Sequence, residues 1–204
     1  MKWVSLGPVS VPASWAAMLV AFLITGTFLA ISKKKATSDW YGNAIFIFIM
    51  TWKLSVIIFQ FKMSIANPMT ILYFNGGTKG YWLGIAGVIT YTVLMKRRSE
   101  TESFNNPILA WIMTVSAYEL VIGMLDEGAI WLTLSQFVIN LLFLILIIFR
   151  KEKSQWQLEL LILFTCIQGL VYSLKGDFFS VPVATYGVLA VFFSFWLIKG
   201  GNNQ

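Results

Sequence analysis

Two charged side chains, Lys53 and Glu119, fall near the middle of long apolar segments. A charge at the centre of a bilayer costs several kcal/mol, so such residues are usually paired or functional. Both are expected at a similar depth, because their helices start from the same membrane face and rise by about 1.5 Å per residue. This predicts a Lys53–Glu119 ion pair. Three interpretations follow: a structural bridge between helices, an anionic headgroup bound by Lys53, or a proton or ion relay.

Polar side chains also recur four residues apart on two further apolar segments. Gln136 and Asn140 form one such pair, and Gln168 and Tyr172 form the other. Residues at this spacing share one face of a helix. We expect both pairs to face other helices rather than lipid. They would serve either as interhelical hydrogen-bonding contacts or as the lining of a lipid cavity.

Several residue types that commonly carry chemistry are scarce. The chain has no histidine and one cysteine, Cys166, so it forms no intrachain disulfide. The thiol lies within an apolar segment, where we expect it to be buried and inert. Neither a metal ion nor another cofactor is predicted.

The composition identifies the elements that position these side chains. Of the 204 residues, 58% are hydrophobic and only 12% are charged, whereas soluble domains carry roughly 25% charged residues. The apolar residues form blocks, and about 20 residues of helix cross a hydrocarbon core. The sequence therefore predicts an all-α integral membrane protein with about seven transmembrane helices, at Trp15–Ile31, Asn43–Phe59, Trp82–Met95, Ile108–Leu125, Ala129–Phe149, Leu158–Leu174 and Val181–Ile198.

The third block is short for a full crossing. It follows a loop, Gln60–Tyr81, whose apolar part Met69–Phe74 we interpret as interfacial or re-entrant. Asn67, Gly76 and Gly77 in this loop permit turns and close backbone approach. If the protein binds a ligand at the outer leaflet, we expect this loop to take part.

The distribution of basic residues predicts the orientation, because cytoplasmic loops are rich in Lys and Arg. Ten basic residues follow the first, third, fifth and seventh helices, against four on the opposite side. The N-terminus is therefore predicted outside and the C-terminus in the cytoplasm. The first block precedes a lysine run rather than a small-residue cleavage site, so we expect a retained helix. The net charge of +6 reflects topology, and dispersed basic residues do not favour a nucleic-acid partner.

No connection is long and no segment is low in complexity, so we expect a single polytopic membrane domain over residues 1–204. An internal repeat of the kind found in many transporters is not evident.

Short motifs along most of the chain resemble prolipoprotein diacylglyceryl transferases, a family of bacterial membrane enzymes. The matching segments follow the family's order and spacing: Leu6-Gly7-Pro8, Trp52-Lys53-Leu54, Asn67-Pro68, Phe74-Asn75-Gly76-Gly77, Asn140-Leu141-Leu142 and Leu174-Lys175-Gly176-Asp177. The resemblance implies seven helices, an outer N-terminus and a multi-pass place in the bacterial cytoplasmic membrane. It also implies the family's chemistry, in which phosphatidylglycerol donates a diacylglyceryl group to a lipoprotein precursor's cysteine.

The residues that this chemistry needs are largely absent. The family's histidine falls at Tyr81, and a neutral tyrosine is a poor base at neutral pH. Its fourth-helix arginine has no counterpart, because no arginine occurs between Arg98 and Arg150. Its further tyrosines, glutamates and arginine fall on neutral residues of other types, namely Ser14, Ser135, Gln136, Gln168 and Tyr172.

Three functions are left open. The first is a degenerate family member that binds membrane lipid, with phosphatidylglycerol suspected, or a lipoprotein signal peptide. The second is an active diacylglyceryl or acyl transferase with an altered site, and the third is a small transporter that uses Lys53 and Glu119. For lipid binding, the predicted residues are Lys53, Asn67, Gly76, Gly77, Tyr81, Gln136, Asn140, Gln168, Tyr172 and Lys175.

Overall fold

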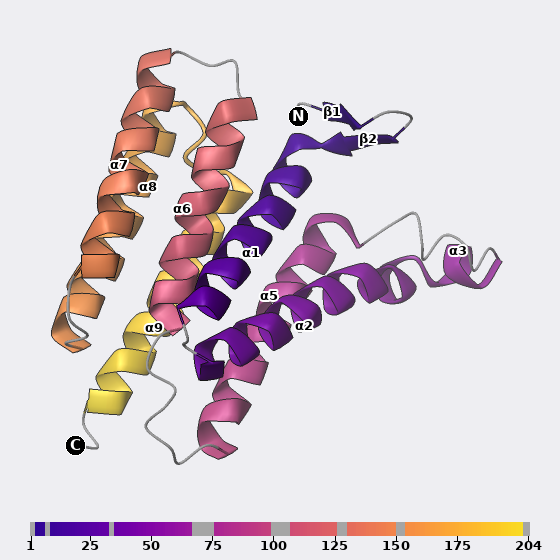
Figure 1. Cartoon of the computed structure of the whole chain (residues 1–204). Coiled ribbons are helices and arrows are strands. Elements are labelled where there is room, and N and C mark those ends of the chain that lie inside the picture. Colours follow the sequence, from indigo (N-terminus) through magenta and orange to yellow (C-terminus); the bar gives the residue numbers. More distant parts are fainter. Residues whose placement is uncertain are drawn as a thin grey trace. The chain divides into compact units, whose positions relative to one another are not determined.

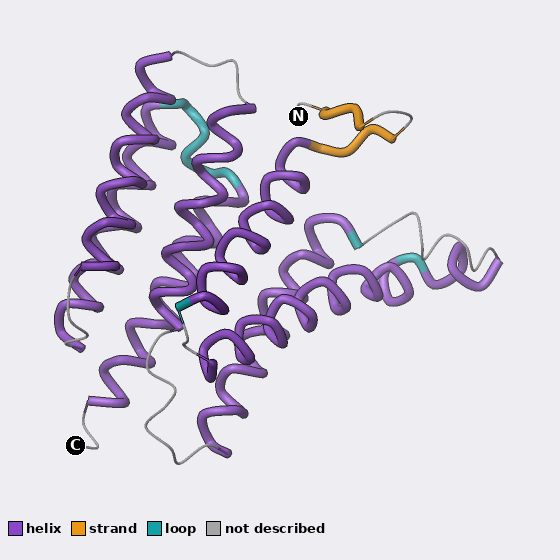
Figure 2. Tube along the Cα trace, viewed as in Figure 1, coloured by secondary structure: helices purple, strands orange, loops and turns teal. Residues whose placement is uncertain are grey.

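A computed structural model describes residues 3–6, 9–32, 35–66, 76–98, 107–125, 130–149 and 154–201, and these are almost entirely helical (Figure 2). A short antiparallel hairpin, β1 and β2, precedes the first helix. In chain order the elements are β1 Trp3–Leu6, β2 Val9–Pro12, α1 Ala13–Ile31, α2 Lys35–Phe59, α3 Phe61–Ala66, α5 Gly77–Arg98, α6 Pro107–Leu125, α7 Ile130–Phe149, α8 Ser154–Leu174 and α9 Val181–Gly201.

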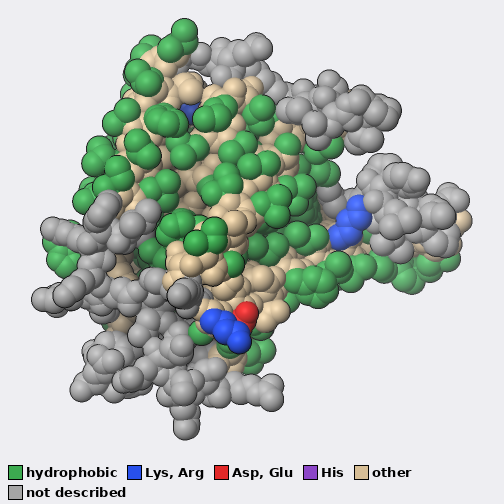
Figure 3. All heavy atoms as spheres, viewed as in Figure 1, with side chains coloured by type: hydrophobic (Ala, Val, Ile, Leu, Met, Phe, Trp, Pro, Cys, Tyr) green, Lys and Arg blue, Asp and Glu red, His purple; other side chains and the backbone are tan. Residues whose placement is uncertain are grey.

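Five of these helices are long and apolar enough to cross a membrane, namely α1, α2, α6, α8 and α9. Helix α7 carries a shorter apolar stretch, Ile130–Leu146. Large apolar side chains cover much of the described surface (Figure 3). A face of this kind is stable in lipid but not in water. The prediction of an α-helical membrane protein is therefore supported.

The helix ends agree with the predicted ones to within four residues except on two helices. Helix α2 starts at Lys35 rather than Asn43, since the polar residues of its first two turns give no apolar signal. Helix α5 runs over 22 residues instead of the 14 predicted, because glycine and threonine dilute its apolar character. The predicted interfacial segment Met69–Phe74 lies outside the described residues.

The chain folds into two compact units. One comprises Met1–Phe28 and Asn106–Gln204, and the other comprises Leu29–Asn105. We call them the bundle unit and the hairpin unit.

In the hairpin unit, α2 and α5 lie side by side along their length (Figure 1). Glycines of α5 allow this close approach. A Cβ atom on Gly84 would lie 2.9 Å from Cδ2 of Phe48 and 3.1 Å from the Phe48 carbonyl oxygen. A Cβ atom on Gly80 would lie 2.1 Å from the Ser55 hydroxyl oxygen. Side chains on α2 therefore fill the space that these glycines leave.

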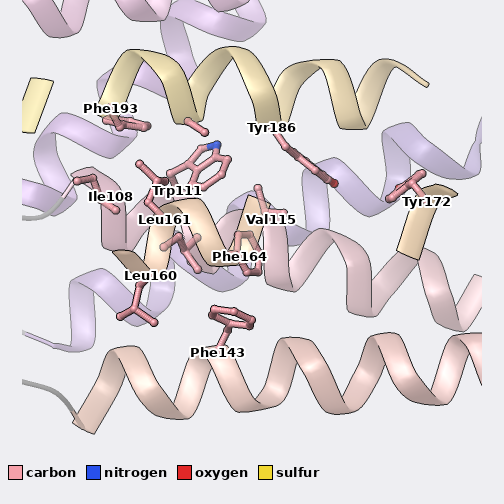
Figure 4. Close-up of a cluster of buried hydrophobic side chains, with 12 residues drawn as sticks. Ile108, Trp111, Val115, Phe143, Leu160, Leu161, Phe164, Tyr172, Tyr186 and Phe193 are labelled. Carbon is pink, nitrogen blue, oxygen red and sulfur yellow. The ribbon is translucent and has the colours of Figure 1, made fainter. Parts of the chain in front are cut away.

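In the bundle unit, α6 packs on α7 and α8 packs on α9. Their apolar core is largely aromatic: Phe143 and Phe164 meet edge to face with ring centroids 4.9 Å apart, and Trp111 packs against Phe164 and Phe193. Figure 4 shows that the two tyrosines of this core, Tyr172 and Tyr186, lie at one end of it.

The connection between α8 and α9 is a tight helix-ending turn. Gly176 has a φ of +79°, a left-handed conformation that glycine adopts without steric cost. Its N–H donates to the Ser173 carbonyl, and the N–H of Asp177 donates to the Tyr172 carbonyl. This pattern is the Schellman motif. It fixes Lys175 at the end of α8, and we call this end of the bundle unit the Lys175 end.

Candidate functional site

The bundle unit contains a buried polar cluster whose members come from four helices. It comprises Glu119 on α6, Gln136 and Asn140 on α7, Gln168 and Tyr172 on α8, and Tyr186 on α9. We call this cluster the Glu119 network. Glu119 is 1% exposed, and it is the only charged residue among the buried residues that the structure describes.

Three donors converge on the Glu119 carboxylate. Tyr172 donates to Oε1 at 2.9 Å, and Tyr186 donates to the same oxygen. The amide Nε2 of Gln136 donates to Oε2 at 2.9 Å. A buried carboxylate needs such partners, because leaving it without them costs several kcal/mol.

A chain of amides extends from Gln136 into the bundle. Its Nε2 also donates to Oε1 of Gln168 at 2.7 Å. Nε2 of Gln168 donates to Oδ1 of Asn140 at 2.9 Å, and Nδ2 of Asn140 donates to the Gln136 backbone carbonyl at 2.8 Å. The last acceptor is a backbone carbonyl, which can only accept. The direction of every hydrogen bond in the chain is therefore fixed, and Gln136 must present its amide hydrogens to Glu119.

One acceptor of this network has no donor. The Oε1 atom of Gln136 is buried and accepts no hydrogen bond from the described part of the chain. Gln136 itself is 2% exposed. The described network therefore contains one buried acceptor, next to Glu119, that no hydrogen-bond donor satisfies.

Lys175 lies beside this network at the end of α8. Its ammonium is 5.5 Å from the centroid of the Tyr172 ring, within the range of a cation–π interaction. Its positive charge also acts on the Glu119 carboxylate.

The four amide and phenol residues predicted from their spacing, Gln136, Asn140, Gln168 and Tyr172, are all brought together here. Sequence reasoning missed Tyr186, and it paired Glu119 with Lys53 instead. The sequence signal that could have grouped these residues is their depth in the membrane. The distance to the helix end nearest Lys175 is about six residues, or about 9 Å, for each of Glu119, Gln136, Gln168 and Tyr186. Lys53 belongs to the other unit, so the Lys53–Glu119 ion pair stays a prediction.

The hairpin unit contains the other predicted residues. The indole nitrogen of Trp52 donates to the carbonyl of Gly77, the first residue of α5, at 3.1 Å. The N–H of Gly76 donates to the Trp52 carbonyl at 3.4 Å. Lys53 follows Trp52, so it lies level with the start of α5. Asn67 lies outside the described residues.

Aromatic rings surround this level of the hairpin. Tyr81 meets Phe48, Trp52 and Trp82 edge to face, at centroid distances of 5.5, 6.3 and 5.7 Å. Tryptophan and tyrosine concentrate where a membrane meets water. This level of the hairpin unit therefore has the composition of a membrane interface.

Two lysines, Lys53 and Lys79, lie at this level of the hairpin unit. Lys53 is half-buried about six residues before the end of α2, and Lys79 on the first turn of α5 is exposed. The Lys79 ammonium lies 6.0 Å from the ring centroid of Phe59. No aspartate or glutamate occurs between Asp39 and Glu100. A helix N-terminus adds N–H groups without intrahelical partners and a partial positive charge.

The structure places Cys166 on the exposed surface of α8, so the expectation of a buried thiol is wrong. The physical reason is that an apolar segment of a membrane protein also has a lipid-facing side.

Comparisons of the chain with family models, with curated proteins and with solved structures gave no match. The resemblance to prolipoprotein diacylglyceryl transferases therefore rests on the short motifs alone.

Proposed function

We propose that this chain is a multi-pass membrane protein that binds the headgroup of an anionic phospholipid, with phosphatidylglycerol as the first candidate. The proposal includes seven crossings, with the N-terminus outside and the bacterial cytoplasmic membrane as the location. The binding region is the level of the hairpin unit where Lys53 lies beside the start of α5.

One observation carries the proposal: the Trp52–Gly77 hydrogen bond sets Lys53 level with the N-terminus of a helix. A phosphodiester is an anion, and both a lysine and a helix N-terminus favour anions. The aromatic rings at the same level suit the depth of lipid headgroups. The segment between Asp39 and Glu100 contains lysines but no acidic residue.

The motif resemblance supports the same ligand. Trp52-Lys53-Leu54 and Gly76-Gly77 are two of its segments, and phosphatidylglycerol is the lipid substrate of the family that the chain resembles. A lipoprotein signal peptide is the second partner that this resemblance implies.

Lipid analysis of the purified protein tests the proposal. We expect phosphatidylglycerol to be enriched over a zwitterionic lipid in wild type. In Lys53→Leu the enrichment should fall roughly tenfold, the equivalent of about 1.4 kcal/mol from a charge-assisted contact. Lys62→Leu removes the same charge from exposed α3 and is the matched control. Equal lipid content in all three proteins would contradict the proposal.

Transferase activity is the alternative that a direct assay separates from binding. The chain has no histidine, and Tyr81 packs against the aromatic rings of Phe48 and Trp52. We therefore expect no lipidation of a lipobox peptide in cells that lack their normal transferase and express this protein. Formation of the thioether product would favour an enzyme with an altered site.

A further inference from the structure

The carboxylate of Glu119 has partners that can accommodate an added proton without the movement of a helix. It accepts from two phenol hydroxyls. A phenol oxygen donates and accepts, so a proton placed on Oε1 finds an acceptor in Tyr172 or Tyr186 after a hydroxyl rotates. At Oε2 the orientation of the Gln136 amide is fixed, so its hydrogen bond to Oε2 stays in place when Oε1 is protonated.

Two opposing effects act on the charge of this carboxylate. Burial disfavours the anion, whereas three hydrogen-bond donors favour it. The titratable and charged groups that act on it are Tyr172 and Lys175 at the end of α8 and Tyr186 on α9. Tyr118, on α6 itself, acts on the two other tyrosines. Helix α7 contributes the neutral Gln136, and α1 has no titratable side chain.

Access to the carboxylate is asymmetric. Tyr172 is two residues from the end of α8, and Ser173 and Asp177 beyond it are exposed. In the other direction the amide chain ends on the Gln136 backbone carbonyl, which neither releases nor takes up a proton. The described hydrogen bonds thus run from Glu119 to Tyr172, which lies near the Lys175 end, and in the other direction they stop inside the bundle.

We propose that Glu119 is a reversible proton-binding site that exchanges protons with water at the Lys175 end of the bundle unit. The uptake is one proton from water onto one carboxylate oxygen, and it converts the buried anion to a neutral acid. Such a site senses the pH on one side of a membrane. The proposal does not rest on lipid binding at Lys53.

Infrared spectroscopy of the protein in phosphatidylcholine bilayers tests the proposal over a pH titration. The difference between the spectra of wild type and Glu119→Gln should contain one pH-dependent carboxylic-acid C=O band. Glu159→Gln, which removes an exposed glutamate of α8, should keep that band. A wild-type spectrum without a pH-dependent band that depends on Glu119 would overturn the proposal, as would a carboxylate that responds to sodium ions but not to protons.

Milder variants keep the test decisive if Glu119→Gln does not fold. Tyr172→Phe removes a donor to the anion and Lys175→Gln removes a nearby cation, so each should shift the band's midpoint to higher pH. Ser173→Ala, at an exposed neighbouring position, should leave the midpoint unchanged. Unshifted midpoints in both Tyr172→Phe and Lys175→Gln would contradict the assignment.

Sealed vesicles test the direction of access. After a pH jump outside, only molecules with the Lys175 end outward should respond at once. Thiol labelling of Asp177→Cys in a Cys166→Ser background measures that fraction. A response that does not follow the labelled fraction would overturn exchange through this end.

Discussion

Gln136 uses both of its amide hydrogens, one on the Glu119 carboxylate and one on Gln168. Interhelical hydrogen bonds inside membranes contribute about 0.6 kcal/mol each on average. The larger effect comes from removing a shared donor, because each buried acceptor left behind costs about 1–3 kcal/mol.

Gln136→Leu should therefore destabilise the bundle unit by about 1–3 kcal/mol, since relaxation of the side chains offsets part of the loss. Thermal unfolding in detergent measures the effect. Ser135→Ala is the matched control, because the Ser135 hydroxyl bonds only within its own helix in the described contacts, to the Leu132 carbonyl. A Gln136→Leu protein as stable as this control would mean that the network contributes little.

The residues of this network could be predicted in part from the sequence. A spacing of four places Gln136 with Asn140 and Gln168 with Tyr172, and that spacing alone shows that each pair shares a face. It does not show which helices are neighbours. Glu119 was therefore assigned to Lys53, although its donors come from α7, α8 and α9.

At the scale of elements, the approach of α2 and α5 depends on glycine. A Cβ atom at Gly84 would meet both the ring and the backbone of Phe48. The backbone carbonyl has no alternative rotamer, so the helices would have to move apart.

Gly84→Ala should destabilise the hairpin unit by about 1–3 kcal/mol, the usual cost of overpacking. Gly187→Ala in α9 is the control, because no atom lies within 4 Å of the added Cβ. Gly187→Ala should leave the free energy of unfolding unchanged or raise it by up to about 1 kcal/mol. Similar unfolding temperatures for Gly84→Ala and wild type would contradict tight packing at this position.

Helix positions were predictable wherever apolar residues reached the helix end. The ends of α6 and α7 fall within a residue of the predicted ones. The early start of α2 was not predictable in this way, since four of the five residues from Lys35 to Asp39 are polar and continue the helix beyond its apolar part. The short elements β1, β2 and α3 were missed, because segments this short carry no hydrophobic period.

At the scale of the molecule, the alternation of basic loops predicts the orientation. We expect the Lys175 end to face outward and the start of α2 to face the cytoplasm. In a Cys166→Ser background, a membrane-impermeant maleimide should label Asp177→Cys in intact cells. It should label Lys35→Cys only after the cells are opened. The reverse pattern would overturn the orientation.

Lipid binding at the hairpin unit is tested most directly by photo-crosslinking with a phosphatidylglycerol analogue that carries a photoreactive headgroup. Peptide mapping should place the adducts around Trp52, Lys53 and the first turn of α5. They should be lost in Lys53→Leu and weak with a phosphatidylcholine analogue. Adducts spread evenly over the apolar helices, with the same yield for both lipids, would contradict the account.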